Sequence, residues 1–217
     1  MTESLTHAST GTRGPLAQAL VALAGTPDDV PDIGERLDRV AQLAADRIGG
    51  IHYAAVATRH DDDCCTVATG GDLEQAITGV PAGATTMAWP GFRETAAAMG
   101  LGMVSVPLFT GSGAAPASLD LYGRDATAMA PLAAGICAAN DPALEWPAES
   151  GTGLGSGAGE LVAGFAEALS VRAGIQLALA MLGGDPGTAY LTLRLRAADR
   201  DLSLPDAADA VIMQGFG

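Results

Sequence analysis

The sequence contains no lysine and very few aromatic residues. All 11 basic residues are arginine, and aromatic residues make up only 4% of the 217 residues. A chain that is 48% hydrophobic but short of large rings must build its core mainly from alanine, valine and leucine. Arginine suits planar, bidentate recognition of anions such as phosphate, but its exclusive use can equally reflect a bias in the coding DNA.

Cysteine and histidine are also scarce, which excludes several kinds of site. Three cysteines cannot build a disulfide framework, and no Cys-x-x-Cys or Cys/His spacing suits zinc. His60, the acidic residues 61–63 and the pair Cys64 and Cys65 are neighbours, but consecutive residues of a hairpin point in alternate directions. We therefore expect a polar turn here, and the sequence predicts neither a metal nor a cofactor.

The chain lacks the marks of a membrane protein, of a secreted protein and of an enzyme. No run reaches the roughly 18 uninterrupted apolar residues that cross a bilayer, and the first residues lack the basic start of a secretory signal. No nucleophile elbow, phosphate-binding loop or dinucleotide-binding motif is convincing. We predict a cytoplasmic protein that is not an enzyme and whose net charge of −14 repels nucleic acid at long range.

The first strong periodic pattern predicts an amphipathic helix. Apolar residues recur at steps of three and four from Ile33 to Ile48 and fall on one helical face. Residues 1–14 are rich in Thr, Ser and Gly and predict a loosely attached start, while Gly49 and Gly50 would end the helix. Two strand-like runs around a polar turn follow, which predicts a hairpin.

The remaining part of the first 140 residues repeats this arrangement. A short helix, a second hairpin and a closing apolar helix, broken near Pro131, follow the first hairpin. Helices and hairpins in this order predict an α+β domain with an antiparallel sheet flanked by helices. The predicted elements are the strands at 51–58 and 64–69, the helix at 92–99, the strands at 103–109 and 117–122, and the helix at 126–139.

Beyond residue 139 the composition changes. Residues 140–159 are rich in proline, glycine and serine and gain little by ordering, so we predict a linker. Only helical periodicity follows, with helix starts at Asp185 and at Ser203, which predicts three short helices. The predicted division is a flexible N-terminus that could include a helix (1–27), an α+β domain (28–139), the linker (140–159) and a small all-α module (160–217).

The α+β region resembles a known sensor family. Residues 89–108, in which a helix leads into the strand Ser-Val-Pro-Leu, look like the back half of the GAF domain in actinobacterial-type GAF–ANTAR regulators. Residues 118–122, Ser-Leu-Asp-Leu-Tyr, match the end of the second hairpin in that family. The resemblance covers about residues 28–139. It implies a GAF-like sensor that detects a small molecule or a protein signal.

The C-terminal region is similar to the ANTAR module over residues 160–213. Residues 168–175 resemble the Arg-x-x-Ile segment of that module's first helix, and residues 183–190 resemble the turn that follows it. Residues 193–194 and 204–208 fit the second helix and the start of the third. The resemblance implies a three-helix ANTAR-like module that binds paired RNA hairpins and prevents transcription termination, and we expect a homodimer.

The module departs from the family pattern in its charge. Residues 178–180, Ala-Leu-Ala, stand where the family usually has Ala-Lys-Gly, and the first helix is expected to be shorter than in the family. Residues 199–203 replace a basic run, so that four arginines face seven acidic residues over 160–217. Because RNA-binding surfaces neutralise phosphates with basic residues, the alternative is a degenerate module that serves dimerisation or protein docking without RNA.

Four arginines are the candidate RNA-binding residues: Arg172, Arg194, Arg196 and Arg200. On a helix Arg196 and Arg200 share a face, whereas Arg194 and Arg196 point apart. The alternative is that they are solvated side chains paired with acids such as Asp199.

Three aromatic residues are the candidate ligand-binding residues: Tyr53, Trp89 and Phe92. In a GAF-like fold these rare bulky side chains could line a concave and mostly apolar pocket. The alternative is ordinary core packing. The leading hypothesis is therefore a signal-responsive transcription antitermination regulator in which GAF-like sensing controls binding of an RNA hairpin.

Overall fold

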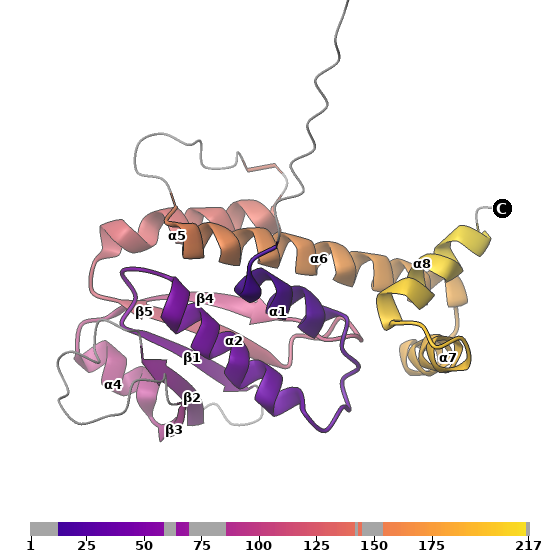
Figure 1. The fold of residues 1–217 in the computed structure, drawn as a ribbon, viewed down its shortest axis with the longest axis horizontal. Helices are drawn as coiled ribbons and strands as arrows, with labels where there is room; N and C mark the ends of the chain where they lie inside the picture. Colours follow the sequence, from indigo (N-terminus) through magenta and orange to yellow (C-terminus); the bar gives the residue numbers. More distant parts are fainter. Residues whose placement is uncertain (1–12, 59–63, 70–85, 142, 145–153, 216–217) are drawn as a thin grey trace, which may run out of the picture.

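The computed structural model describes residues 13–58, 64–69, 86–141, 143–144 and 154–215. Residues 1–12 of the predicted loose start, the polar turn at 60–63 and half of the predicted linker lie outside the described residues. The architecture is α+β, as predicted, with one antiparallel sheet and helices packed on it (Figure 1).

The sheet has five strands in the order β3-β2-β1-β5-β4, and all neighbours are antiparallel. Both predicted hairpins are confirmed, because β1 pairs with β2 and β4 pairs with β5. The edge strand β3 is an addition that the sequence did not indicate. The strands are β1 Tyr53–Thr58, β2 Cys64–Thr69, β3 Met87–Pro90, β4 Gly102–Leu108 and β5 Ala117–Gly123.

The two faces of the sheet are buried in separate hydrophobic clusters. On β5, Leu119 and Leu121 enter the main core, whereas Asp120 and Tyr122 alternate to the opposite face. Helices α1, α2, α5 and the first half of α6 contribute to the main core, while α4 contributes to the cluster on the opposite face. These helices are α1 Pro15–Ala24, α2 Ile33–Arg47, α4 Phe92–Ala98, α5 Ala126–Asn140 and α6 Ser156–Leu182.

Two helices near the predicted domain boundaries differ in part from the expectation, although the helix expected within residues 1–27 is present as α1. The stretch 126–139 is not broken near Pro131, because α5 runs through it with Leu132 and Ile136 buried in the main core. Burial of this helix outweighs the single backbone hydrogen bond that proline removes. Helix α1 lies in the predicted N-terminal segment, yet its Leu16 and Leu20 belong to the main core, so it is an integral part of the α+β unit.

Helix α6 differs most from the prediction. It is one continuous helix of 27 residues that begins at Ser156, inside the predicted linker, instead of a short helix. In its first half Leu161 and Phe165 belong to the main core, and in its second half Ile175 and Ala178 belong to a separate core. By length and composition, α6 is also the one helix among the described residues that could cross a membrane, although core helices pass the same test.

The second half of α6 forms a three-helix module with α7 Pro186–Asp199 and α8 Leu204–Gly215. Both predicted helix starts are confirmed. The carboxylate of Asp185 accepts a hydrogen bond from the N–H of Thr188 (3.0 Å), and the hydroxyl of Ser203 accepts one from the N–H of Asp206 (3.2 Å). We call residues 171–215 the helical module and the rest of the described chain the sheet domain.

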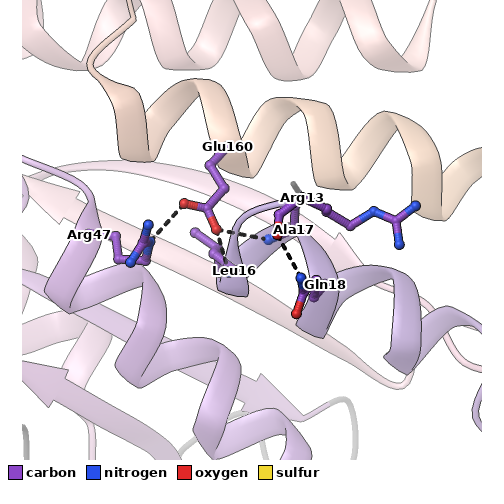
Figure 2. A network of polar contacts seen from close by, with 6 residues as sticks. All are labelled: Arg13, Leu16, Ala17, Gln18, Arg47 and Glu160. Atoms are coloured by element: carbon purple, nitrogen blue, oxygen red, sulfur yellow. Dashed lines mark hydrogen bonds and ion pairs between the residues drawn. The ribbon is translucent and has the colours of Figure 1, made fainter. Parts of the chain in front are cut away.

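One carboxylate fastens α6 to the sheet domain. Glu160 accepts hydrogen bonds from the N–H groups of Leu16 (2.5 Å) and Ala17 (3.4 Å) at the start of α1, and from Nε of Arg47 (2.7 Å) at the end of α2 (Figure 2). The first N–H groups of a helix have no partner within it, so a side chain from α6 supplies the missing acceptor for α1. The Glu160 side chain is only 10% exposed.

Burial alone would raise the pKa of Glu160. The hydrogen bonds from Arg47, Leu16 and Ala17 together lower it by more, so the net pKa lies below its ordinary value. A lowered folded-state pKa means that the stabilisation is complete above the unfolded-state pKa and is lost as pH falls through the folded-state pKa. We expect Glu160→Gln to reduce the free energy of unfolding by about 1–3 kcal/mol at neutral pH, with a smaller difference below about pH 4.

Urea unfolding at several pH values measures this difference. Glu167→Gln is the matched control, because Glu167 lies on the same helix and forms an exposed ion pair with Arg13. Such a pair contributes only about 0–1 kcal/mol. Equal losses in the two variants, or a loss from Glu160→Gln that does not change with pH, would show that Glu160 does not fasten α6.

Candidate functional site

The four arginines predicted to bind RNA divide into two pairs. Arg172, on α6, donates from Nε to the carbonyl of Gly113 (2.9 Å), and its guanidinium lies 4.7 Å from the centre of the Phe109 ring. Arg194, on α7, forms an ion pair with Asp29 (2.9 Å). Both partners belong to the sheet domain, so Arg172 and Arg194 are engaged within the molecule.

Arg196 and Arg200 are differently placed. Within the part of the chain that the structure describes, neither side chain forms an ion pair or a side-chain hydrogen bond, and the expected pairing with Asp199 is not seen. Both border a shallow depression between α7 and α8 that also includes Val211 and Gln214. These two cations, four residues apart, are therefore the ones available to an external anion in this conformation.

The three aromatic residues predicted to bind a ligand do lie together. Phe92 is completely buried at the centre, with the rings of Tyr53 and Trp89 at 5.3 and 5.1 Å between centroids. Tyr122, which sequence reasoning missed, adds a fourth ring at 5.1 Å from Phe92. The four rings come from β1, β3, α4 and β5 and lie on the face of the sheet opposite the main core.

A buried polar group lies beside the rings. The carboxylate of Asp120 is completely buried and accepts hydrogen bonds from Nη2 (2.8 Å) and Nε (3.2 Å) of Arg93 and from the hydroxyl of Ser105 (2.6 Å). The hydrogen bond to Asp120 raises the pKa of Arg93. Burial raises the pKa of Tyr122 to about 12, so its phenol stays protonated at neutral pH.

The hydroxyl of Tyr122 is buried without a well-formed hydrogen bond among the described residues. A cavity of about 180 Å³ opens next to the Arg93 guanidinium; it is lined by Ala57, Thr58, Arg93, Pro107, Ala115, Ala117 and Ser118. None of the four rings lines this cavity, and Phe92 and Tyr122 are buried, so the rings pack as a small core beside it. The cavity itself offers the polar side chains of Arg93, Thr58 and Ser118 to a small ligand.

The outer surface of the helical module carries several exposed large apolar side chains. Leu191 and Leu195, one turn apart on α7, are 58% and 65% exposed. Leu202, in the turn after α7, is also exposed (38%). The large apolar side chains exposed in this module are Leu177, Met181, Leu191, Leu195, Leu202 and Met213.

Comparisons with models of protein families, with curated proteins and with solved structures found no match for this chain. Among the described residues, no three His, Cys, Asp or Glu side chains are placed to hold a metal ion.

Proposed function

We propose that this chain is a signal-responsive regulator in which a GAF-like sensor controls an ANTAR-like module that binds hairpin RNA and prevents transcription termination. The observation that carries the coupling is α6, whose first half is in the core of the sheet domain and whose second half is in the core of the helical module. A helix shared by two cores transmits a shift in one to the other, because packed interiors deform little.

The signal would act on the aromatic face of the sheet. Phe92 and Arg93 are consecutive on α4, so the same short helix contacts the ring cluster and the buried carboxylate of Asp120. A ligand that inserts between these groups would move α4 against the sheet. A molecule with an aromatic or aliphatic body and one hydrogen-bonding end fits this surface best.

In response to the signal, the helical module would bind a pair of RNA hairpins. The free guanidinium groups of Arg196 and Arg200 would make the first phosphate contacts. An electrophoretic mobility-shift titration with a tandem hairpin RNA, repeated at several fixed salt concentrations, tests this proposal. We expect saturable binding that exceeds the binding of a single hairpin and weakens as salt rises, because phosphate contacts release counterions. Absence of binding, or binding that does not change with salt, would remove the RNA-binding function.

A second candidate output is protein docking, in particular dimerisation, and the exposed leucines of α7 favour it. Burying a leucine side chain contributes about 1.5–3 kcal/mol, so we expect the double variant Leu191→Ser with Leu195→Ser to raise the dimer dissociation constant at least about tenfold. Sedimentation equilibrium measures this constant. Leu144→Ser is the control, since Leu144 is also a well-exposed leucine (50%) but lies outside the module. An unchanged constant would exclude this face of α7 as the interface.

A further inference from the structure

Two loops of the sheet domain form hydrogen bonds and an ion pair with the helical module. From the loop between α1 and α2, Asp29 forms an ion pair with Arg194 (2.9 Å), and the N–H of Asp28 donates to the hydroxyl of Tyr190 (3.2 Å). Both partners lie on α7. This loop therefore holds the second helix of the module by one charged and one neutral contact.

The loop between β4 and β5 holds α6 in the same way. The carbonyl of Gly113 accepts from Arg172 (2.9 Å), and the carbonyl of Ser112 accepts from the side-chain amide of Gln176 (2.6 Å). The two loops are also joined to each other, because the carboxylate of Asp28 accepts from the N–H of Ser112 (3.0 Å). They form one connected structure, which we call the latch: Asp28, Asp29, Ser112 and Gly113 on one side and Arg172, Gln176, Tyr190 and Arg194 on the other.

Close backbone packing completes the contact at the start of α8. A Cβ atom on Gly111 would lie 2.5 Å from Cδ2 of Leu204 and 2.9 Å from the carbonyl oxygen of Thr26. A Cβ atom on Gly25 would lie 2.9 Å from Cγ of Pro205. Glycine at these two positions lets the loops approach the module closely. With this contact, all three helices of the module touch the sheet domain.

The latch is a weak closure. Its one ion pair is exposed to solvent, with Arg194 at 34% and Asp29 at 62%. An open cavity of about 620 Å³ is lined partly by residues of the latch, namely Ser112, Gly113, Arg172, Gln176 and Tyr190. The polar contacts of the latch are few and partly exposed, and such contacts open at lower cost than the packing of the first half of α6 in the main core.

We propose that the latch is autoinhibitory: it withholds Arg172 and Arg194 from RNA, and its opening doubles the number of arginines that the helical module offers to phosphate. This inference rests on the proposed RNA-binding function. The module carries four arginines in total, and two of them contact the sheet domain. If the open state binds RNA better than the closed state, the apparent association constant falls as the fraction of closed molecules rises.

The test is a double variant, Asp29→Asn with Gln176→Ala, that removes the ion pair of one loop and the Gln176 hydrogen bond of the other and keeps every arginine. We expect its affinity for a tandem hairpin RNA to exceed that of the wild type by roughly three- to tenfold, the scale of one or two partly exposed polar contacts. Its affinity should also fall more steeply with salt, because more phosphates are neutralised. Tyr190→Phe, which removes the acceptor for Asp28, is a second and milder opening variant.

The control is Asp209→Asn, which makes the same charge change at an exposed position of α8 outside the latch. Circular dichroism melts establish that each variant is folded. Tighter binding in both opening variants but not in the control supports the latch. If the wild type binds RNA and the opening variants bind equally well, the latch is overturned and the RNA-binding function stands. If neither the wild type nor the opening variants bind, the RNA-binding function itself is wrong, and the latch falls with it.

Discussion

Replacing Phe92 with alanine is expected to lower the free energy of unfolding by about 3–5 kcal/mol, the cost of removing a large side chain from a packed interior. Phe92 is completely buried and its ring contacts those of Tyr53, Trp89 and Tyr122. Each aromatic pair adds about 0.5–1.5 kcal/mol beyond the burial of its surface. The cavity left by alanine cannot collapse easily, because the neighbouring rings are held by three different strands.

Chemical denaturation followed by circular dichroism measures this loss. Phe92→Leu is the companion variant, which keeps an apolar side chain and is expected to lose distinctly less stability. A loss of under about 1 kcal/mol for Phe92→Ala would show that the ring cluster is not a packed core, since changes of that size are ordinary for point variants.

The double variant Arg196→Ala with Arg200→Ala is expected to weaken binding of tandem hairpin RNA at least about tenfold at physiological salt, because each cation lost removes a phosphate contact. These two side chains lack a salt bridge in the described chain and border the same depression between α7 and α8. Filter binding with purified full-length protein measures the change.

The matched control for that experiment is Arg39→Ala with Arg124→Ala. It removes the same charge from two positions of the sheet domain that are exposed and have no salt-bridge partner in the described residues. Equal weakening in the two double variants would mean that RNA responds only to the total charge of the protein. The proposed role of the α7–α8 surface would then be wrong.

Much of the fold was predictable because local patterns coincide with tertiary burial. The alternation in Leu119, Asp120 and Leu121 places two side chains in the main core and the third on the opposite face, as the structure has them. The strand β3 was not predictable, since four residues that end in Pro90 make a weak pattern. The length of helix α6 was not predictable, because its buried side changes along the helix. No single apolar stripe therefore marks where it begins or ends.

The candidate sites show the same limit. Tyr53, Trp89 and Phe92 stood out because bulky residues are rare in this chain, but Asp120 and Arg93 meet only when α4 packs on the sheet. The role of Arg194 could not be predicted either, because its partner Asp29 is 165 residues away in the sequence. Contacts of that range depend on how whole elements pack, which no local pattern encodes.

The most direct test of RNA recognition by the helical module is the salt dependence of hairpin RNA binding by the unmodified protein. With Arg196 and Arg200 free, we expect the logarithm of the association constant to fall linearly with the logarithm of salt concentration, with a slope near −2, or steeper where RNA binding opens the latch. A measurable association constant that does not change between low and high salt, or no binding at low salt, would contradict the proposed function.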